Sequence, residues 1–483
     1  MAVTLYTSRV VLNSLGISDF GLYNVVGGIV SIMGFLNAAM SNATQRYLSY
    51  DIGIGNFNKL QHTFNTTLIV HILISGIIFI LGESVGVYYI NNHLNFPPER
   101  QIAVNLVFQF SLFTLILNII QVPYNSLILA REHMTVYAYM SILEAGLKLL
   151  TAMLLIFGKG DKLILYSILT FLVALVLRIL YQIYCRKNFS ESKFKFVFDR
   201  KYILELVNYS GWNLFGSLSV AGKNQGLNLI LNIFYGTVIN AAYGIAIQVQ
   251  GAVNQFVGNF QMAVNPQIIK NYASGNRDQS LVLMNMSAKG SYFLMLFIIC
   301  PIMINCNFIL KMWLLKVPNY TLDFVRLSCI MLLIDTISGP FMTGVVATGK
   351  IKFYNIIIGG INLLVLPISY VLLKEGFKVN SVFYLLILYS IVSMFFRIFF
   401  VKKQYNFRIS YFIKNVLIKI LLVTIICAIV CYTIYPYVKE NWTSFFVSTI
   451  FLFILISITI YFLGLNSNEK NKLYYFILNK FKR

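Results

Sequence analysis

The chain has 483 residues, of which 58% are hydrophobic and only 11% are charged, whereas an ordinary soluble domain carries about 25% charged residues. This composition excludes a soluble globular protein and indicates a polytopic membrane protein. The net charge of +22 does not indicate nucleic acid binding, because the basic residues are scattered between apolar runs and do not gather on one domain.

The apolar runs predict an all-α integral membrane protein with about fourteen transmembrane helices, since about 20 apolar residues cross a bilayer. No loop on the far side of the membrane exceeds about a dozen residues, so an extramembrane catalytic domain has no place and we do not expect an enzyme. The predicted spans lie near residues 1–14, 20–40, 64–90, 103–130, 137–158, 163–185, 206–235, 240–264, 288–310, 324–347, 353–373, 381–400, 415–438 and 442–464.

The loops that follow the even-numbered spans hold most of the lysines and arginines, as in RKNFSESKFKFVFDRK at residues 186–201 and VKKQYNFR at 401–408. Cytoplasmic loops carry such an excess. We therefore expect both termini to be cytoplasmic. The six cysteines form no CxxC pair and no metal-ligand spacing with histidines, so we expect buried thiols and no metal site.

The stretch VVLNSLGISDFGLYNVVGG, which begins at residue 10, interrupts the apolar runs with polar residues and glycines. It is similar to LILNIFYGTVINAAYG, which begins at residue 229. Placing the two side by side pairs Gly16 with Gly236 and Tyr23 with Tyr243. We interpret the first stretch as the periplasmic turn between spans one and two, with Asp19 beginning the second span.

A second, independent similarity joins VPYNSLILAREHMTVYAY, in span four, to GPFMTGVVATGKIKFYNI, in span ten, and pairs Pro123 with Pro340. Two such matches predict a duplicated six-helix unit, and the two copies are related by an axis along the membrane normal. The expected organisation is an N-terminal six-helix lobe (1–185), a basic cytoplasmic linker (186–205), a C-terminal six-helix lobe (206–400), two additional transmembrane helices (401–465) and a basic cytoplasmic tail (466–483).

The first predicted span is shorter than its counterpart in the second lobe. Residues 1–14 reach only about 21 Å as a helix, against a hydrocarbon core about 30 Å thick. Either translation starts upstream of Met1 or this helix is shortened at its N-terminus.

The runs SRVVLNSLGISDFGLYNVVGG, SNATQRYLS and VPYNSLILARE resemble Wzx-type polysaccharide flippases of the multidrug/oligosaccharidyl-lipid/polysaccharide exporter superfamily. The resemblance implies the MATE-like (MOP) fold, with two six-helix lobes and two trailing helices. It also implies that the protein flips undecaprenyl-diphosphate-linked oligosaccharide repeat units from the cytoplasmic to the periplasmic leaflet by alternating access, for polysaccharide or O-antigen (lipopolysaccharide) biosynthesis. The implied partners are this lipid-linked oligosaccharide, membrane lipids, and a polysaccharide polymerase with other assembly proteins.

A glycan and a diphosphate cannot cross hydrocarbon, so a polar, cationic cavity is needed, and a charge at mid-membrane usually faces a cavity or a partner. Lys223, with Asn224 and Gln225 beside it in span seven, is the strongest candidate for substrate binding; the alternative is a buried lysine paired with an acid. Arg9 could bind phosphate through two hydrogen bonds. In the flippases that the chain resembles, a basic residue before the glycine that corresponds to Gly16 lines the cavity. Arg46 could receive the headgroup from the cytoplasmic side or be a solvated interfacial arginine.

Glu144 and Lys148 lie four residues apart in span five, a spacing that permits a mutual ion pair. They are also candidates for ion coupling (Glu144) and substrate binding (Lys148). Asp335, deep in span ten, could bind H+ or Na+ to drive transport; we expect no other cofactor. Three further basic residues are closer to helix ends, and we expect them to extend to the cytoplasmic interface: Arg178, Arg397 and Lys419.

Pro123 and Pro340 should each remove a backbone hydrogen bond and kink spans four and ten, as hinges or as static bends. Amides in span eight recur at helical spacings and indicate either a wet face or helix-to-helix hydrogen bonds: Gln248, Gln250, Asn254, Asn259 and Gln261. Two other functions fit the pattern. One is a multidrug or cation antiporter of the same fold, and the other is an integral-membrane glycan polymerase.

Overall fold

The computed structural model describes residues 2–94, 96–196, 199–314, 317–405, 407–467 and 469–471, and the described residues form helices joined by short loops, with no β-strand among them. The predicted all-α class is therefore confirmed. The chain divides into two compact units, Met1–Leu214 and Phe215–Arg483.

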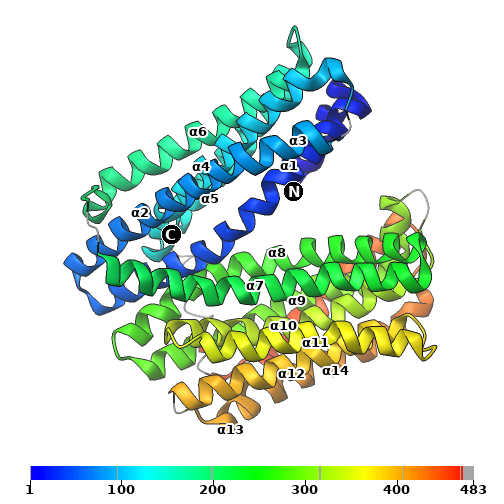
Figure 1. Cartoon of the computed structure of the whole chain (residues 1–483). Helices are drawn as coiled ribbons and strands as arrows, with labels where there is room; N and C mark the ends of the chain where they lie inside the picture. Colours follow the sequence, from blue (N-terminus) through cyan, green and yellow to red (C-terminus); the bar gives the residue numbers. More distant parts are fainter. Residues whose placement is uncertain are drawn as a thin grey trace, which may run out of the picture. The chain divides into compact units, whose positions relative to one another are not determined.

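The first unit is built around α4, which packs against α1, α2 and α6 (Figure 1). The start of α7 also belongs to this unit, because Tyr47 in α1 donates a hydrogen bond to Glu205 at 3.2 Å. The helices are α1 (Ala2–Ile54), α2 (Phe57–Leu81), α3 (Val87–His93), α4 (Gln101–Ala130), α5 (Met134–Phe157), α6 (Lys162–Asn188) and α7 (Arg200–Tyr235), with a π-helical turn at Gly82–Gly86 joining α2 to α3.

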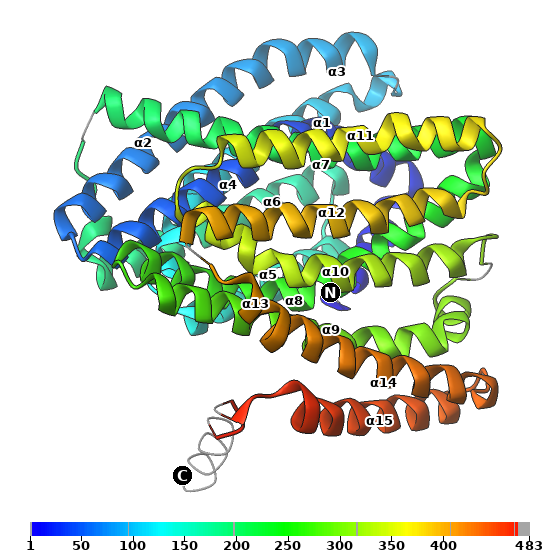
Figure 2. The ribbon, with the colours of Figure 1, turned by 90° about the horizontal axis from the view of Figure 1, so that it is seen from below.

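The second unit is built around α10, which packs against α8, α9 and α12. α14 and α15 lie together at one edge, where they contact α9 (Figure 2). The helices that follow α7 are α8 (Thr237–Ala273), α9 (Arg277–Trp313), α10 (Thr321–Ala347), α11 (Lys352–Lys374), α12 (Asn380–Tyr405), α13 (Ile409–Phe412), α14 (Ile418–Ile434) and α15 (Trp442–Thr459).

Gly16 and Gly236, the glycines that the sequence comparison pairs, have nearly the same backbone conformation. Gly16 has φ 76° and ψ 169° and divides α1 into two helical segments, while Gly236 has φ 72° and ψ −167° and separates α7 from α8. Only glycine adopts this region without strain. With α1 counted as two segments, α2 with α3 as one and α13 with α14 as one, the described helices match the fourteen predicted spans, and the turn predicted at Gly16 is confirmed.

Ten of the described helical segments are long and apolar enough to cross a membrane, which agrees with a multi-pass membrane protein. α7 and α8 are not among the ten. Both carry polar side chains along their length, including Lys223 in α7 and Gln250 in α8. The polar residues of these two helices therefore need partners inside the protein.

Pro123 and Pro340 lie inside α4 and α10, each seven residues before the last residue of its helix. α9 contains a clear backbone break instead: Asn305, four residues after Pro301, has φ −96° and ψ 16°. Asn305 donates its side-chain amide to the Pro301 carbonyl oxygen at 3.1 Å. A hinge role for Pro123 and Pro340 stays a prediction.

Candidate functional site

The second unit encloses a polar pocket of about 290 Å³ between α7, α8, α10 and α12. Its charged lining residues are two cations, Lys223 and Arg397, and one carboxylate, Asp335. Apolar side chains, among them Phe383, form part of the lining, and its polar uncharged members are Asn224, Tyr243, Gln250, Asn254, Gln261, Ser328, Thr336 and Tyr389.

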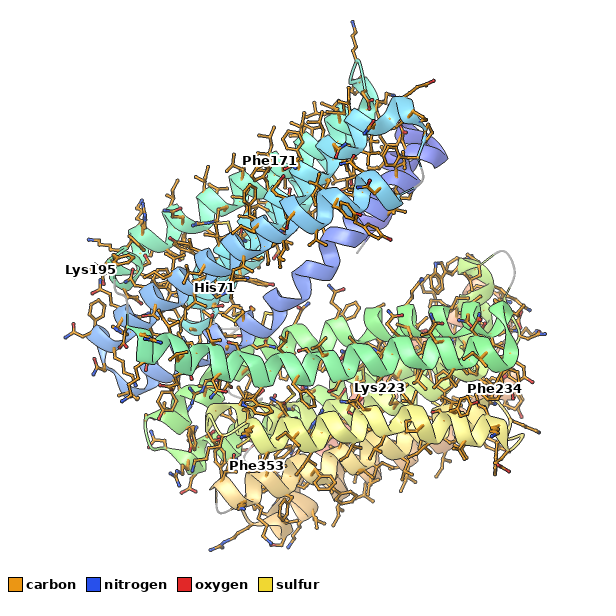
Figure 3. All side chains as sticks on the ribbon, in the orientation of Figure 1. His71, Phe171, Lys195, Lys223, Phe234 and Phe353 are labelled. Atoms are coloured by element: carbon orange, nitrogen blue, oxygen red, sulfur yellow. The ribbon has the colours of Figure 1, made fainter. Side chains whose placement is uncertain are left out.

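Lys223 lies in the middle stretch of the second unit (Figure 3) and is only 8% exposed. Its ammonium nitrogen lies 4.3 Å from the centre of the Tyr389 ring. A desolvated cation over an aromatic face is stabilised by about 2 kcal/mol, so this ring can offset part of the cost of holding the charge inside the protein. The lysine is therefore held over Tyr389 while it lines the pocket.

Small residues bring α7 close to α11 on either side of Lys223. A Cβ atom on Gly226 would lie 2.6 Å from Leu366, and one on Gly359 would lie 2.7 Å from the Phe215 ring. Glycine at such contacts lets helix backbones approach each other. Gly226 in α7 and Gly359 in α11 therefore allow these two helices to pack closely near Lys223.

Arg397 is fixed by two hydrogen bonds. Its Nη1 donates to the Ser338 hydroxyl at 2.5 Å and its Nε donates to the Tyr354 hydroxyl at 3.2 Å. Ser338 in turn donates to the backbone carbonyl of Asp335 at 3.0 Å. Our expectation that Arg397 extends to the cytoplasmic interface is wrong, because these partners in α10 and α11 hold the guanidinium in the pocket wall.

Asp335 lines the same pocket as Lys223 and Arg397. The pocket therefore carries two positive charges against one negative charge. Because the acid is near, the alternative that Lys223 is a buried lysine balanced by an acid stays open beside the substrate-binding role.

The α8 amides serve both roles that their spacing suggested. Gln261 donates to the Ser291 hydroxyl and to the Thr336 carbonyl oxygen, each at 3.2 Å, and so links α8 to α9 and α10. Gln250 and Asn254 line the pocket. Gln261 is therefore both a helix-to-helix contact and part of the pocket lining, whereas Gln248 and Asn259 are exposed and lie outside this lining.

The structure brings together Lys223, Asn224 and Asp335 of the predicted site residues. Gln225 is exposed and is not part of this lining. The Arg9 side chain lies outside the described part of the chain, although the α1 backbone there is helical. Arg397 and Tyr389 are pocket residues that the sequence analysis did not identify.

Arg46 belongs to the first unit and is 7% exposed. Its guanidinium carbon lies 4.6 Å from the centre of the Tyr47 ring, 4.8 Å from that of Tyr50 and 5.4 Å from that of Tyr209. The alternative of a solvated interfacial arginine is therefore wrong. Whether Arg46 receives a headgroup stays a prediction.

Glu144 and Lys148 form the ion pair that their spacing permits, with 2.6 Å between the charged atoms. Both side chains are well exposed on α5, at 43% and 54%. Their roles in ion coupling and substrate binding stay predictions.

The first unit has a pocket at the corresponding place, with a volume of about 200 Å³ and a lining from α1, α4 and α6. Tyr23 lines it as its partner Tyr243 lines the other pocket. At the spacing that pairs Pro123 with Pro340, Asn118 in the first pocket corresponds to Asp335. The lining of the first pocket is uncharged: Tyr23, Gly27, Val30, Ser111, Thr114, Leu115, Asn118, Ser167 and Thr170.

Comparisons with known proteins identify the class of this fold. The MatE family model matches residues 2–154, and a search of curated proteins gave no match. Among solved structures, the chain is similar to a MATE protein in complex with MaL6, with a TM-score of 0.72 and 13% identity over 84% of this chain and 92% of that one.

Two further structures are similar over comparable lengths. One is a MOP superfamily transporter from Pyrococcus furiosus described as having a binding pocket of reverse polarity, with a TM-score of 0.70 and 14% identity over 85% of this chain and 93% of that one. The other is an outward-facing multidrug resistance MATE family transporter, with a TM-score of 0.68 and 13% identity over 83% and 96%. The chain thus has the MATE/MOP transporter fold, with a MatE match in its first unit.

Proposed function

We propose that this protein is a transporter that flips an undecaprenyl-diphosphate-linked oligosaccharide from the cytoplasmic to the periplasmic leaflet by alternating access, for polysaccharide biosynthesis. The observation that carries the proposal is the charge of the pocket in the second unit, where Lys223 and Arg397 outnumber Asp335. A site for an anion needs this sign, and a site for a cation needs the opposite one.

The lining residues suit the two parts of such a substrate. An ammonium and a guanidinium are the groups that hold phosphate oxygens, and the amides of Asn224, Gln250 and Asn254 can donate to and accept from sugar hydroxyls. A volume of about 290 Å³ equals that of about ten waters in the liquid. It accommodates a diphosphate or one sugar ring, so we assign this pocket to the diphosphate end of the substrate.

The multidrug or cation antiporter remains the second candidate. It is favoured by the MatE match and by the similarity to a multidrug resistance transporter. Within the pocket, Asp335 and the rings of Tyr389 and Phe383 are groups that attract a lipophilic cation. A test must therefore separate substrates by the sign of their charge.

The test is transport by the purified full-length protein in liposomes, with a fluorescent lipid-linked oligosaccharide in one assay and a fluorescent organic cation in the other. We expect the protein to accelerate headgroup exposure of the lipid-linked glycan, and Lys223→Ala to slow it at least tenfold. Gln225→Ala is the matched control, because this residue follows on α7 but is exposed, and it should transport as the wild type does.

The outcomes separate the candidates. If the lipid-linked glycan crosses no faster than in protein-free liposomes while the cation is transported, the flippase proposal is wrong and the antiporter is the better candidate. Normal glycan transport by Lys223→Ala would leave the flippase in place but remove this residue from its site. Glycan polymerisation by the purified protein alone would overturn both transport proposals.

The proposal places the protein in the bacterial inner membrane with both termini in the cytoplasm, next to the polymerase that uses the flipped repeat unit. The high density of basic residues in the loops after spans six, eight, ten and twelve supports this orientation. A reporter that fluoresces only in the cytoplasm, fused to the C-terminus, should be bright; a dark fusion to a protein present at normal levels would contradict it.

A further inference from the structure

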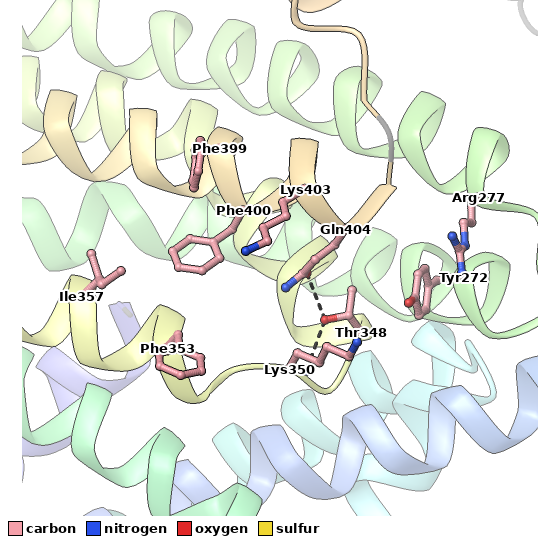
Figure 4. Close-up of a pocket in the computed structure, with 10 residues that line it drawn as sticks. All are labelled: Tyr272, Arg277, Thr348, Lys350, Phe353, Ile357, Phe399, Phe400, Lys403 and Gln404. Carbon is pink, nitrogen blue, oxygen red and sulfur yellow. Dashed lines mark hydrogen bonds between the residues drawn. The ribbon is translucent and has the colours of Figure 1, made fainter.

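A second, larger cavity of about 640 Å³ lies within the second unit, where α8 and α12 end and where α9 and α11 begin (Figure 4). Its lining combines three basic side chains, Arg277, Lys350 and Lys403, with aromatic ones that include Phe353 and Phe399. The proposed transport function does not use this cavity.

The basic residues come from three different elements: the first turn of α9, the loop between α10 and α11, and the last turns of α12. No acidic side chain is part of the lining. Arg277 lies with its guanidinium carbon 5.6 Å from the centre of the Tyr272 ring, an arrangement that stabilises its charge at the cavity wall. The cavity is therefore positively charged without an internal counter-ion.

The corresponding loop of the first unit, between α4 and α5, is different. Its Arg131 is paired with the buried Glu191, with 2.5 Å between the charged atoms. A basic residue at this end of a lobe can thus be neutralised within the fold. In the second unit the three cations line a cavity instead.

The polar wall of the cavity is held in place by hydrogen bonds, which Figure 4 shows as dashed lines. The Thr348 hydroxyl donates to the Gln404 side-chain oxygen at 3.0 Å, and the Lys350 backbone N–H donates to the same hydroxyl at 3.2 Å. These bonds tie the α10–α11 loop to the end of α12, so Lys350 and Lys403 are presented from elements of fixed relative position.

The apolar wall faces outward. Phe353 is 69% exposed and Phe399 is 55% exposed, and both lie on helices that are apolar enough to span a membrane. Exposed rings beside basic side chains at a helix end are typical of the membrane interface. The cavity therefore offers cations to a headgroup and aromatic surface to acyl chains.

We propose that this cavity binds the phosphate headgroup of an anionic phospholipid, with the acyl chains along Phe353 and Phe399. The positive-inside rule assigns this basic end of the unit to the cytoplasmic leaflet. The phosphate of a phospholipid can contact the basic side chains while its acyl chains contact the aromatic ones, whereas a free phosphate can contact only the basic side chains. This ligand is a resident lipid, and its binding does not depend on the transport proposal.

The test is thermal unfolding of the detergent-solubilised full-length protein titrated with phosphatidylglycerol, phosphatidylcholine or glycerol 3-phosphate. We expect phosphatidylglycerol to raise the unfolding temperature more than the other two. In the variant that combines Lys350→Gln with Lys403→Gln, the apparent affinity for phosphatidylglycerol should fall about 25-fold, because each lysine near an anionic lipid surface contributes about a five-fold factor.

The matched control combines Lys374→Gln with Lys378→Gln, and should bind as the wild type does. Both lysines are exposed; Lys374 is the last residue of α11, and Lys378 lies in the loop that follows. If the cavity variant does not fold, Lys350→Arg with Lys403→Arg replaces it and must retain binding, and added salt must weaken binding to the wild type. Three results would overturn the proposal. They are an affinity for phosphatidylglycerol in the cavity variant equal to that of the wild type, stabilisation by glycerol 3-phosphate equal to that by phosphatidylglycerol, and binding that does not change with salt concentration.

Discussion

Tyr23 lines a pocket of about 200 Å³ in the first unit, and its counterpart Tyr243 lines one of about 290 Å³ in the second. The first pocket contains Asn118 where the second contains Asp335, and only the second contains charged side chains. The two copies thus share helices, turns and a pocket position but differ in charge. Duplication explains the scaffold, while the electrostatic specialisation of the second unit explains why we assign the substrate's charged end to it.

The largest expected effect concerns the arginines of α6 and α12. Arg397 bonds to Ser338 and Tyr354 and is the neighbour of Asp335. Arg397→Ala should lower the free energy of unfolding by about 3–5 kcal/mol, because Ser338 and Tyr354 each lose a hydrogen bond to a charged group and Asp335 loses a cation of its own pocket. The measurement is the temperature at which the detergent-solubilised protein unfolds.

Arg178 of α6 is the matched control. Its guanidinium carbon lies 4.4 Å from the centre of the Tyr124 ring, and its Nη1 donates to Gln182 at 3.0 Å. No acid lines the neighbouring pocket of the first unit, so Arg178→Ala should cost only about 1 kcal/mol. Equal costs at the two positions would show that the charge difference between the pockets has no energetic consequence.

The next effect tests the acid itself. Asp335→Asn gives the second pocket the side chain that Asn118 supplies to the first. We expect the free energy of unfolding to fall by about 2.5 kcal/mol, because Lys223 and Arg397 are left without a counter-charge inside the membrane. If Asp335 couples transport to an ion gradient, the variant should also transport at a rate that does not change with the pH or sodium gradient.

Asn118→Ala provides the comparison for that variant. It alters an uncharged pocket and should leave the gradient dependence of transport intact. Gradient-driven transport by Asp335→Asn at the wild-type rate would exclude Asp335 as the coupling site and leave Glu144 as the remaining candidate.

The fold could be predicted from the sequence because its signals are local: apolar runs locate the spans, and paired residues such as Gly16 and Gly236 reveal the duplication. Lys223 and Asp335 could be identified because a charge stands out within an apolar run. Arg397 could not, since in sequence it lies only five residues from Lys402 and looks like part of the basic helix end. Only the packing of α12 against α10 and α11, which brings it to Ser338 and Tyr354, places it in the pocket.

A smaller effect tests the similarity of the two units. Gly236→Ala should cost about 2 kcal/mol, because alanine is strained at φ 72°, ψ −167°, and Gly16→Ala should cost about the same. A Cβ atom at either position meets nothing within 4 Å, so the cost comes from the backbone alone. Gly244→Ala is the control, because a Cβ atom there also meets nothing within 4 Å but Gly244 has no positive φ; it should be neutral or slightly stabilising. If this control lowers the unfolding temperature as much as Gly236→Ala does, backbone strain does not explain the cost.

The smallest expected effect concerns the two units at the ends that we predict to be periplasmic. In the first unit Arg100 contacts Asp19 and Asp161, each at 2.5 Å, whereas in the second Lys311 contacts a single exposed carboxylate, Glu440, at 2.7 Å. Hydrogen bonds from Lys311 and Asn307 hold the pKa of Glu440 below its usual range. A pKa lower in the folded than in the unfolded state stabilises the fold above the unfolded pKa, and this contribution is lost as the pH falls through the folded value.

Glu440→Gln should therefore lower the unfolding temperature slightly at neutral pH, and the difference from the wild type should vanish in acid. Thermal unfolding curves of the variant and the wild type, collected from neutral to acid pH, measure this difference. Glu375→Gln, which alters an exposed glutamate between α11 and α12, should show no such convergence. If the difference in unfolding temperature between Glu440→Gln and the wild type stays constant down to acid pH, the charge of Glu440 does not contribute to stability. The contact to Lys311 then acts through the conformation of the loop.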